Sequence, residues 1–268
     1  PSHARAKELT GYPAVIGFYT MDESSEDCVP NLTLLRRMLN EVAPDRIVNT
    51  CNIMRSAPFL PTADIQGGDS YPVKKDRSSS LRDPFRRLGE LKACNPGAIW
   101  YAPQCYNWAR STKGARNDAE LYRRSGREPT MEEMLSVALC MVADRVNGFL
   151  FYAYFDILEC PVPEWKEARW QAMCEIAKKM LDLEPFIMSG ETITEIPCDD
   201  KKGTVRASVL SDGKDGKRVI VTGLDLEHDS TFKLPADCAH LRPTMGRVEC
   251  SGGVCRFRGG AFSCEILK

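Results

Sequence analysis

The sequence predicts an α/β fold in which helices cover a parallel sheet, followed by a small module built only of strands. Three observations predict it. Apolar runs of strand length alternate with amphipathic helical stretches, the alternation stops near residues 187 to 192, and short strand-like segments follow. Continuously apolar runs are typical of strands that helices bury on both faces. A length of 268 residues allows one large domain, or a medium domain with a small one.

The first part of the chain alternates strand and helix. The predicted strands are "VIGFYTM", "DRIVNTCNI", "ADIQGGDSYPV", "GAIWYAPQ" and "VNGFLFYAYFDI". The predicted helices are "PNLTLLRRMLNEV", "DPFRRLGELKAC", "PTMEEMLSVALCMVAD" and "PEWKEARWQAMCEIAKKMLDLEPFI". In the third helix, Thr130 and Glu133 form an S/T-x-x-E capping box. A long polar loop is expected from Cys105 to Pro129.

The last part of the chain has a different texture. Short segments such as "TVRASVL" and "RVIVTGLDL" are joined by the turn-forming stretch "SDGKDGK". Short strands between turns of this kind are typical of a small sandwich. The sequence therefore predicts two domains, an α/β domain over residues 1–188 and a β-sandwich over residues 189–268.

Composition excludes several classes of function. The formal net charge is −1, which gives no general attraction to nucleic acid or to an anionic membrane surface. No apolar run approaches the roughly 18 residues of a membrane helix, and the first residues lack the pattern of a signal peptide, so we expect a soluble chain. The chain also lacks the G-x-G-x-x-G, G-x-x-x-x-G-K-[ST] and G-x-S-x-G motifs of nucleotide binding and serine hydrolysis.

Cysteine and histidine do not indicate a metal site. The chain has 12 cysteines, without any C-x-x-C pair, and three histidines. We expect most of the cysteines to be small buried side chains, with Cys250, Cys255 and Cys264 as the exceptions because they lie close together in the strand-rich tail. A nucleophile at Cys105 would need a histidine base, and no histidine follows a predicted strand of the α/β domain. No metal or organic cofactor is implied.

Polar and aromatic side chains follow every predicted strand of the α/β part. Parallel α/β folds form their sites at the carboxyl ends of the strands, so these side chains are the candidates for a site. Rings beside acids and amides suit a sugar, because the rings cover C–H patches while the polar groups bond hydroxyls. The candidates are Asp22, Glu23, Asn49, Asn52, Asp69, Tyr71, Gln104, Tyr106, Trp108, Tyr154 and Asp156.

Five segments carry a resemblance to a known family. In order, "YPAVIGFYTMDE", "GGDSYPV", "WYAPQCYNW", "REPTMEEMLSVAL" and "NGFLFYAYFD" resemble the second half of the barrel in bacterial glycoside-hydrolase-like proteins of the (β/α)8 clan. The resemblance implies a TIM-barrel type fold represented by strands four to eight, with the β tail as an accessory sandwich. It also implies a carbohydrate substrate or ligand, and a secreted or periplasmic location for the full-length protein.

The resemblance also implies roles for two strand ends. Members of this clan close barrel strand four with a Glu acid/base, which Glu23 matches, and strand seven with a nucleophilic Glu, where this chain has Gln104. Strand alternation independently puts Gly17, Tyr19, Met21 and Glu23 on one face, which turns Asp22 sideways as a partner that orients or tunes Glu23. Burial against the aromatic residues Tyr19 and Trp100 is expected to raise the pKa of Glu23.

Two departures from the family pattern, Gln104 and the missing strands one to three, leave several alternatives open. An amide at residue 104 cannot form a glycosyl ester. The remaining routes are an inverting reaction with Asp69 or Asp156 activating water, a substrate-assisted reaction in which Asp22 positions an acetamido group, or sugar binding without reaction, as in a non-catalytic protein or an inactive fragment. The missing strands one to three imply a longer polypeptide, a second chain that fills the gap, or a rearranged sheet. The basic stretch "ARSTKGARNDAELYRRSGRE" is compatible with an acidic sugar, although such runs are usually solvated.

Overall fold

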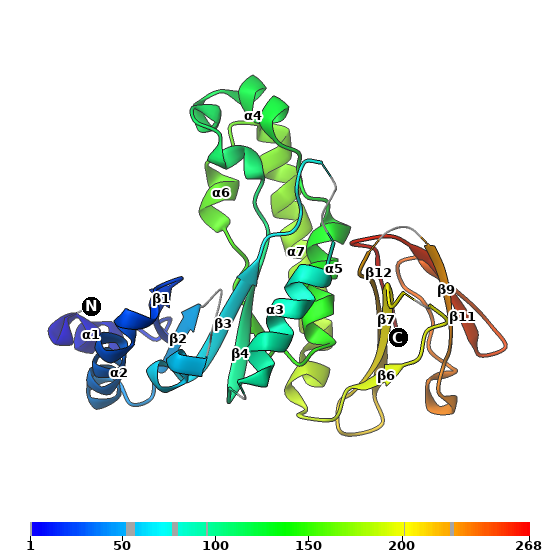
Figure 1. Ribbon diagram of the computed structural model, residues 1–268, viewed down its shortest axis with the longest axis horizontal. Coiled ribbons are helices and arrows are strands. Elements are labelled where there is room, and N and C mark those ends of the chain that lie inside the picture. Colours follow the sequence, from blue (N-terminus) through cyan, green and yellow to red (C-terminus); the bar gives the residue numbers. More distant parts are fainter. Residues whose placement is uncertain (1, 52–56, 77–79, 95, 201, 226–227) are drawn as a thin grey trace. The chain divides into compact units, whose positions relative to one another are not determined.

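The chain has a mixed α/β fold in the computed structural model, which describes residues 2–51, 57–76, 80–94, 96–200, 202–225 and 228–268 (Figure 1). A five-stranded sheet has the order β1-β2-β3-β4-β5 with parallel pairing, and two antiparallel sheets follow. The chain forms two compact units, Pro1–Ser70 with Arg86–Ala102, and Tyr71–Phe85 with Pro103–Lys268. Within the described ranges, no helix is long and apolar enough to cross a membrane.

The first unit confirms the predicted alternation of strands and helices. Its strands are β1 Gly17–Asp22, β2 Ile47–Cys51, β3 Ile65–Ser70 and most of β4 Ala98–Pro103. Its helices are α1 His3–Thr10, α2 Val29–Val42, most of α3 Arg82–Ala93, and the short 3-10 helices Glu26–Cys28 and Ala57–Thr62. The sequence pattern did not predict α1, which is capped by the hydroxyl of Ser2.

The core of the first unit lies between its helices and its sheet. Leu39 of α2 packs with Phe18 of β1, Val48 of β2 and Ala6 of α1, and all four are buried. α2 contributes because its apolar residues recur at helical spacing along one face. In the sheet, Asp22 lies opposite Cys51, and Cys51 lies opposite Gly67. This register brings the carboxyl ends of the three strands to one edge.

The second unit consists of Tyr71–Phe85, which follows β3, and of the chain from Pro103 onward. Its elements before the β module are the 3-10 helices Trp108–Ser111 and Ala115–Asn117, α4 Ala119–Ser125, α5 Met131–Val142, β5 Gly148–Phe149, α6 Tyr154–Leu158 and α7 Pro163–Met188. The predicted capping box is confirmed, with Thr130 and Glu133 each accepting a hydrogen bond from the other's backbone N–H. α7 carries Pro163 in its first turn, where a missing N–H has no cost.

Two predictions about this region are wrong. The expected polar loop from Cys105 to Pro129 instead contains three short helical segments that bury Ala109, Ala115 and Tyr122 in a small core. The expected strand over "VNGFLFYAYFDI" is only the two residues of β5. After a backbone bridge between Tyr152 and Gln104 the chain turns into α6, where Tyr154 and Phe155 are exposed while Asp156 and Ile157 are buried.

The strand-rich tail is a sandwich of two antiparallel sheets. One sheet has the order β12-β8-β7-β6 and the other the order β10-β11-β9. Buried side chains from both sheets, including Val209, Val219, Phe232 and Phe257, form the core between them. The strands are β6 Thr194–Ile196, β7 Val205–Ser211, β8 Lys217–Gly223, β9 His228–Lys233, β10 Val248–Ser251, β11 Val254–Gly259 and β12 Cys264–Leu267.

A second core joins the sandwich to the helices before it. Leu135 and Leu139 of α5 and Ile176 of α7 pack in one cluster with Ile220 of β8 and Ile266 of β12. The compact unit therefore runs through the sequence boundary near residue 189, which falls between α7 and β6. The outer faces of β8 and β12 are apolar because α5 and α7 cover them.

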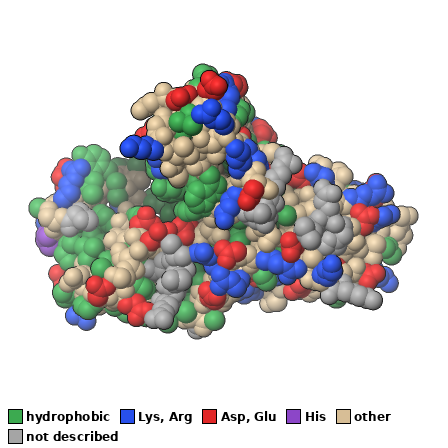
Figure 2. All heavy atoms as spheres, turned by 45° about the horizontal axis from the view of Figure 1, so that its top comes forward, with side chains coloured by type: hydrophobic (Ala, Val, Ile, Leu, Met, Phe, Trp, Pro, Cys, Tyr) green, Lys and Arg blue, Asp and Glu red, His purple; other side chains and the backbone are tan. Residues whose placement is uncertain are grey.

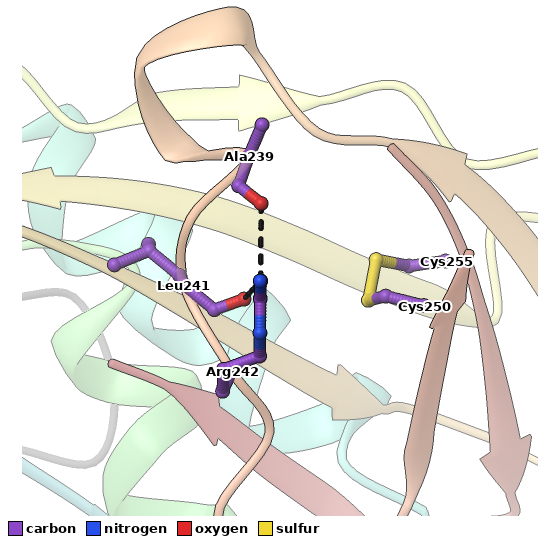
Figure 3. The surroundings of a disulfide bond; sticks show 5 residues. All are labelled: Ala239, Leu241, Arg242, Cys250 and Cys255. Atoms are coloured by element: carbon purple, nitrogen blue, oxygen red, sulfur yellow. Dashed lines mark hydrogen bonds between the residues drawn. A yellow bond between two sulfur atoms is a disulfide. The ribbon is translucent and has the colours of Figure 1, made fainter. Parts of the chain in front are cut away.

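A disulfide joins two neighbouring strands of the second sheet of the sandwich. Cys250 of β10 and Cys255 of β11 lie directly opposite one another and are bonded (Figure 3). Figure 3 also shows Arg242, whose guanidinium donates to the carbonyls of Ala239 and Leu241. Cys264 is a buried thiol without a disulfide, so grouping it with the first two was wrong.

We predict opposite effects for two glycine-to-alanine substitutions in the first unit. A Cβ on Gly67 would lie 2.3 Å from the carbonyl oxygen of Thr50, so Gly67→Ala should lower the free energy of unfolding by about 1–3 kcal/mol. A Cβ on Gly89 in α3 would meet nothing within 4 Å, so Gly89→Ala should raise it by about 0.5–1 kcal/mol. Chemical denaturation of both variants checks this, and equal effects would contradict the register of β2 and β3.

Candidate functional site

The carboxyl end of β1 contains a β-bulge. Tyr19 pairs with Asn49 and Met21 pairs with Thr50, so Thr20 is an extra residue in β1. The bulge shifts the alternation, and Phe18 and Met21 are the buried side chains while Tyr19 is 51% exposed. The expectation that Gly17, Tyr19 and Met21 share one face is therefore wrong.

The bulge brings Tyr19 and Asp22 together. The phenol of Tyr19 donates a hydrogen bond of 2.8 Å to Oδ1 of Asp22. Burial is the largest influence on the pKa of Tyr19 and raises it, and the nearby thiol of Cys51 and the Asp22 carboxylate raise it further. Tyr19 therefore stays protonated and acts as the hydrogen-bond donor to Asp22.

Glu23 continues past the strand in an unusual backbone conformation. Its φ is 51°, in the left-handed region, and its N–H donates to the carbonyl of Cys51 at 3.0 Å. The pKa of Glu23 is raised to about 7. Desolvation is the largest cause, then the charge of Asp69, a hydrogen bond with Asp69 and the charge of Asp22, while Arg87 lowers the pKa. The side chains that raise this pKa are acids, so the expected contribution of Trp100 stays a prediction.

The side chain of Asp69 on β3 forms a hydrogen bond with that of Glu23 across β2. Asp69 follows Gly67 on β3 and is 5% exposed. Strands two apart in a sheet are about 9–10 Å apart, a distance that a Glu and an Asp side chain span together. Cys51 of β2 lies between them, and burial, then Asp69 and Asp22, raise the pKa of its thiol, which stays neutral. The unit thus presents a carboxyl pair from the ends of β1 and β3.

The two asparagines predicted at the end of β2 have different outcomes. Asn49 is buried within β2, and its carbonyl accepts a hydrogen bond from the hydroxyl of Thr20. Asn52 lies outside the described residues. Asp22, Glu23 and Asp69 are therefore the members of the predicted set that the first unit brings together.

Gln104 lies in the second unit and is fully buried. Its Nε2 donates to the carbonyls of Val73, at 2.9 Å, and Tyr106, at 3.0 Å, and its Oε1 accepts from the N–H of Val73 at 2.8 Å. Both ends of the amide are therefore bonded to backbone groups. Gln104 anchors the segment around Tyr71 and Val73.

Three of the predicted aromatic residues form one cluster with a fourth. The ring centroids of Tyr71 and Tyr106 are 5.1 Å apart, and those of Tyr106 and Trp108 are 5.2 Å apart. Tyr152, which the sequence analysis did not select, contacts Tyr71 at 5.5 Å and Tyr106 at 5.8 Å. Tyr154 lies elsewhere, 57% exposed on α6 with its ring 5.7 Å from Trp170.

Asp156 belongs to a buried network of charges. It lies on α6 with 2% of its surface exposed, and its Oδ2 accepts from Nη1 of Arg169 at 2.9 Å. Arg169, whose side chain is fully buried, also donates from Nε to Glu128 at 2.7 Å and from Nη2 to the same carboxylate. Arg110 approaches the other oxygen of Asp156 at 3.4 Å. Burial raises the pKa of Asp156, and the attraction of Arg169 and Arg110 opposes that rise.

Asn107 ties the network to the aromatic cluster. Its side-chain amide donates to Glu128 at 2.9 Å and accepts from the N–H of Ala109 at 2.9 Å. Its backbone N–H donates to Asp156 at 3.4 Å. Because Asn107 lies between Tyr106 and Trp108 in the chain, these contacts hold both rings in place.

Sequence reasoning missed Arg110, Glu128, Tyr152 and Arg169. A signal for one of them was present, because Arg169, Ile176 and Leu183 are spaced seven apart and all three face inward from α7. A charged residue at an inward helical position indicates a buried ion pair. Among the described residues, no group of three or more His, Cys, Asp or Glu side chains is arranged to hold a metal.

Comparison with known proteins supports the fold and gives no sequence relative. No protein-family model and no curated protein matches the chain. Solved structures do match it. A GH27 β-L-arabinopyranosidase from Geobacillus stearothermophilus has a TM-score of 0.56 at 10% identity, over 99% of this chain and 60% of that one. Eubacterium rectale Amy13B and a debranching enzyme from Nostoc punctiforme each have a TM-score of 0.54 at 11% identity, over 99% of this chain and 62% and 60% of theirs.

These neighbours define the class of fold. The chain has a glycoside-hydrolase-like fold, α/β with a β domain after it, and it spans about 60% of the length of the structures that it matches. At 10–11% identity the likeness concerns the fold alone.

We predict that the buried ion network is worth much more than a surface ion pair. Arg169→Met leaves the carboxylates of Asp156 and Glu128 without their buried partner and should lower the free energy of unfolding by about 3–5 kcal/mol. Arg116→Met removes an exposed pair with Glu159 and should cost less than about 1 kcal/mol. Denaturant unfolding measures both, and similar costs would show that Arg169 does not carry the network.

Proposed function

We propose that the protein acts on a carbohydrate in the manner of a glycoside hydrolase, with Glu23 as the general acid/base. The observation that carries the proposal is the carboxyl pair of Glu23 and Asp69 at the carboxyl ends of β1 and β3. Two interacting carboxyls favour retention of a proton on one of them, and a carboxyl that stays protonated near neutral pH can protonate a leaving oxygen. The glycosidase-like fold supports this choice among acid-dependent reactions.

Asp69 has a different role in this proposal from that of a nucleophile. Acid and nucleophile in retaining glycosidases are about 5–5.5 Å apart, and acid and base in inverting enzymes are about 6.5–9.5 Å apart. The hydrogen bond between Glu23 and Asp69 is closer than either arrangement. We assign Asp69 to holding Glu23 and raising its pKa. Asp22 is the third carboxylate of the set, and it is exposed and accepts a hydrogen bond from Tyr19.

The second unit supports the sugar-binding side of the proposal. Tyr71 and Trp108 are half-buried and offer aromatic surfaces that suit the C–H faces of a sugar, and the buried ring of Tyr106 packs against both. Gln104 and Asp156 act indirectly, by holding these rings, because their polar atoms bond to backbone and to arginine. Tyr154 adds a surface ring beside Trp170. Solved neighbours are described in complexes with arabinose and with maltose, which supports a sugar ligand.

We predict that Glu23→Gln abolishes glycoside hydrolysis, because an amide cannot deliver a proton to the leaving oxygen. The loss should be about 10²- to 10⁴-fold in kcat/KM on whichever aryl glycosides and glycans of a test panel the wild type cleaves. Glu8→Gln, at an exposed site on α1, is the matched control and should keep wild-type activity.

A Glu23→Gln variant within about threefold of wild type would remove Glu23 from the mechanism. A wild type that binds sugars in the panel without cleaving any would replace hydrolysis with the non-catalytic alternative.

We also predict that Asp69, together with burial, shifts the pH dependence of activity upward. Glu23 is the proton donor, so activity should fall as pH rises through about 7, the pKa of Glu23 beside Asp69. Asp69→Asn removes the repelling charge and the accepting carboxylate, so the falling limb should move toward the ordinary value of 4.5. Carbon-detected NMR titration of the Glu23 carboxyl and the pH profile of kcat/KM measure the shift, and an unmoved limb would show that Asp69 does not tune Glu23.

A further inference from the structure

A cage of aromatic rings surrounds one arginine of the second unit. The guanidinium carbon of Arg110 lies 5.4 Å from the ring centroids of Tyr106 and Tyr152 and 4.8 Å from that of Phe155. The rings of Tyr152 and Phe155 are themselves in edge contact at 5.5 Å. These four residues, Tyr106, Arg110, Tyr152 and Phe155, are called the Arg110 cage below.

The Arg110 cage contains a hydrogen-bond donor without an acceptor. Nε of Arg110 is 3.4 Å from Oδ1 of Asp156, whereas Nη1 is shielded from solvent and has no hydrogen-bond partner among the described residues. Buried donors of this kind normally have a protein or water partner, so an unfilled one indicates a missing oxygen acceptor. The side chain of Arg110 keeps 13% exposure, and Phe155, the least buried wall, is 41% exposed. The exposed side of the Arg110 cage is therefore that of Phe155.

The charges around the cage favour an uncharged ligand. Arg110 and Arg169 are balanced by Asp156 and Glu128 in the same network, so the network has no excess positive charge. The other arginines of the basic stretch are also largely engaged, since Arg116 pairs with Glu159, Arg123 with Glu164 and Arg127 with Glu133. Figure 2 shows Lys and Arg side chains interspersed with Asp and Glu over the face drawn.

We propose that the Arg110 cage is a subsite for a neutral sugar residue, in which Nη1 of Arg110 donates to a hydroxyl or ring oxygen. The exposed side of the Phe155 ring covers the C–H face of the sugar. An acidic sugar is disfavoured because its carboxylate would meet Asp156, which already lies against the guanidinium. The inference rests on the carbohydrate function proposed above and adds the charge class of the ligand and the residue that selects it.

The test compares neutral and acidic trisaccharides by binding alone. The probes are maltotriose, cellotriose and xylotriose as neutral chains and trigalacturonate as the acidic one, measured by saturation-transfer NMR and calorimetry. We expect at least one neutral probe to bind, and trigalacturonate to bind at least about tenfold more weakly. Arg110→Met should weaken the neutral probe by about tenfold or more, because the methionine keeps contact with the rings and lacks the donor.

Matched variants keep the test decisive. Arg116→Met, in the same stretch but paired at the surface, should bind as wild type does. Arg110→Lys keeps the charge beside Asp156 and lacks the planar Nη1 donor, so it should also weaken binding if Arg110→Met fails to fold. Thermal unfolding of each variant verifies the fold before binding is compared.

Three results would overturn the subsite: trigalacturonate binding as tightly as the neutral probes, Arg110 variants binding as wild type does, or no probe binding. Its failure is separable from that of the proposed reaction, because Glu23→Gln should leave binding at the cage unchanged. If sugar binding depends on Arg110 and no sugar is hydrolysed, the subsite stands and the proposed reaction is rejected. If sugars are hydrolysed equally well by the wild type and the Arg110 variants, the reaction stands and the subsite is rejected.

Discussion

The buried guanidinium of Arg169 is the interaction on which the second unit depends. An ion removed from water is stable only when charged partners and hydrogen bonds replace its hydration. Arg169 on α7 obtains them from Glu128, which precedes α5, and from Asp156 on α6. Two segments, the one before α5 and the one that forms α6, are therefore held to α7 through one side chain. Asn107 extends the network to the aromatic cluster, so the rings proposed to meet a sugar are positioned by contacts with the partners of Arg169.

The first unit meets a different constraint, the close packing of parallel strands. Gly67 lets β3 approach β2, and the bulge at Thr20 adjusts the end of β1 relative to β2. These backbone features set the positions of Glu23 and Asp69, and the small side chain of Cys51 belongs to the strand between theirs. A larger side chain at residue 51 would separate the two carboxyls. The acidity proposed for Glu23 therefore originates in strand geometry as much as in the carboxyl itself.

The glycosidase-like fold and the candidate site give different kinds of support. Fold similarity at 10–11% identity concerns the architecture alone, and one architecture can host several reactions. The position aligned by resemblance with a nucleophile is occupied by Gln104, whose amide is committed to backbone partners. Support for function consequently comes from the carboxyl pair and the aromatic cluster.

The sequence by itself determined the alternation of strands and helices, the capping box of α5, the sandwich after residue 189 and the identity of the acids at the strand ends. These are local properties, since periodicity, caps and turns depend on residues close together in the chain. Tertiary structure decided the rest. The bulge that turns Tyr19 toward Asp22, the helix that replaces the strand at Tyr154, and the burial of Arg169 depend on pairing and charge contacts between distant segments. The roles of Gln104 and Asp156 were decided in the same way, because a side chain's partners, rather than its type, determine whether it is available to a ligand.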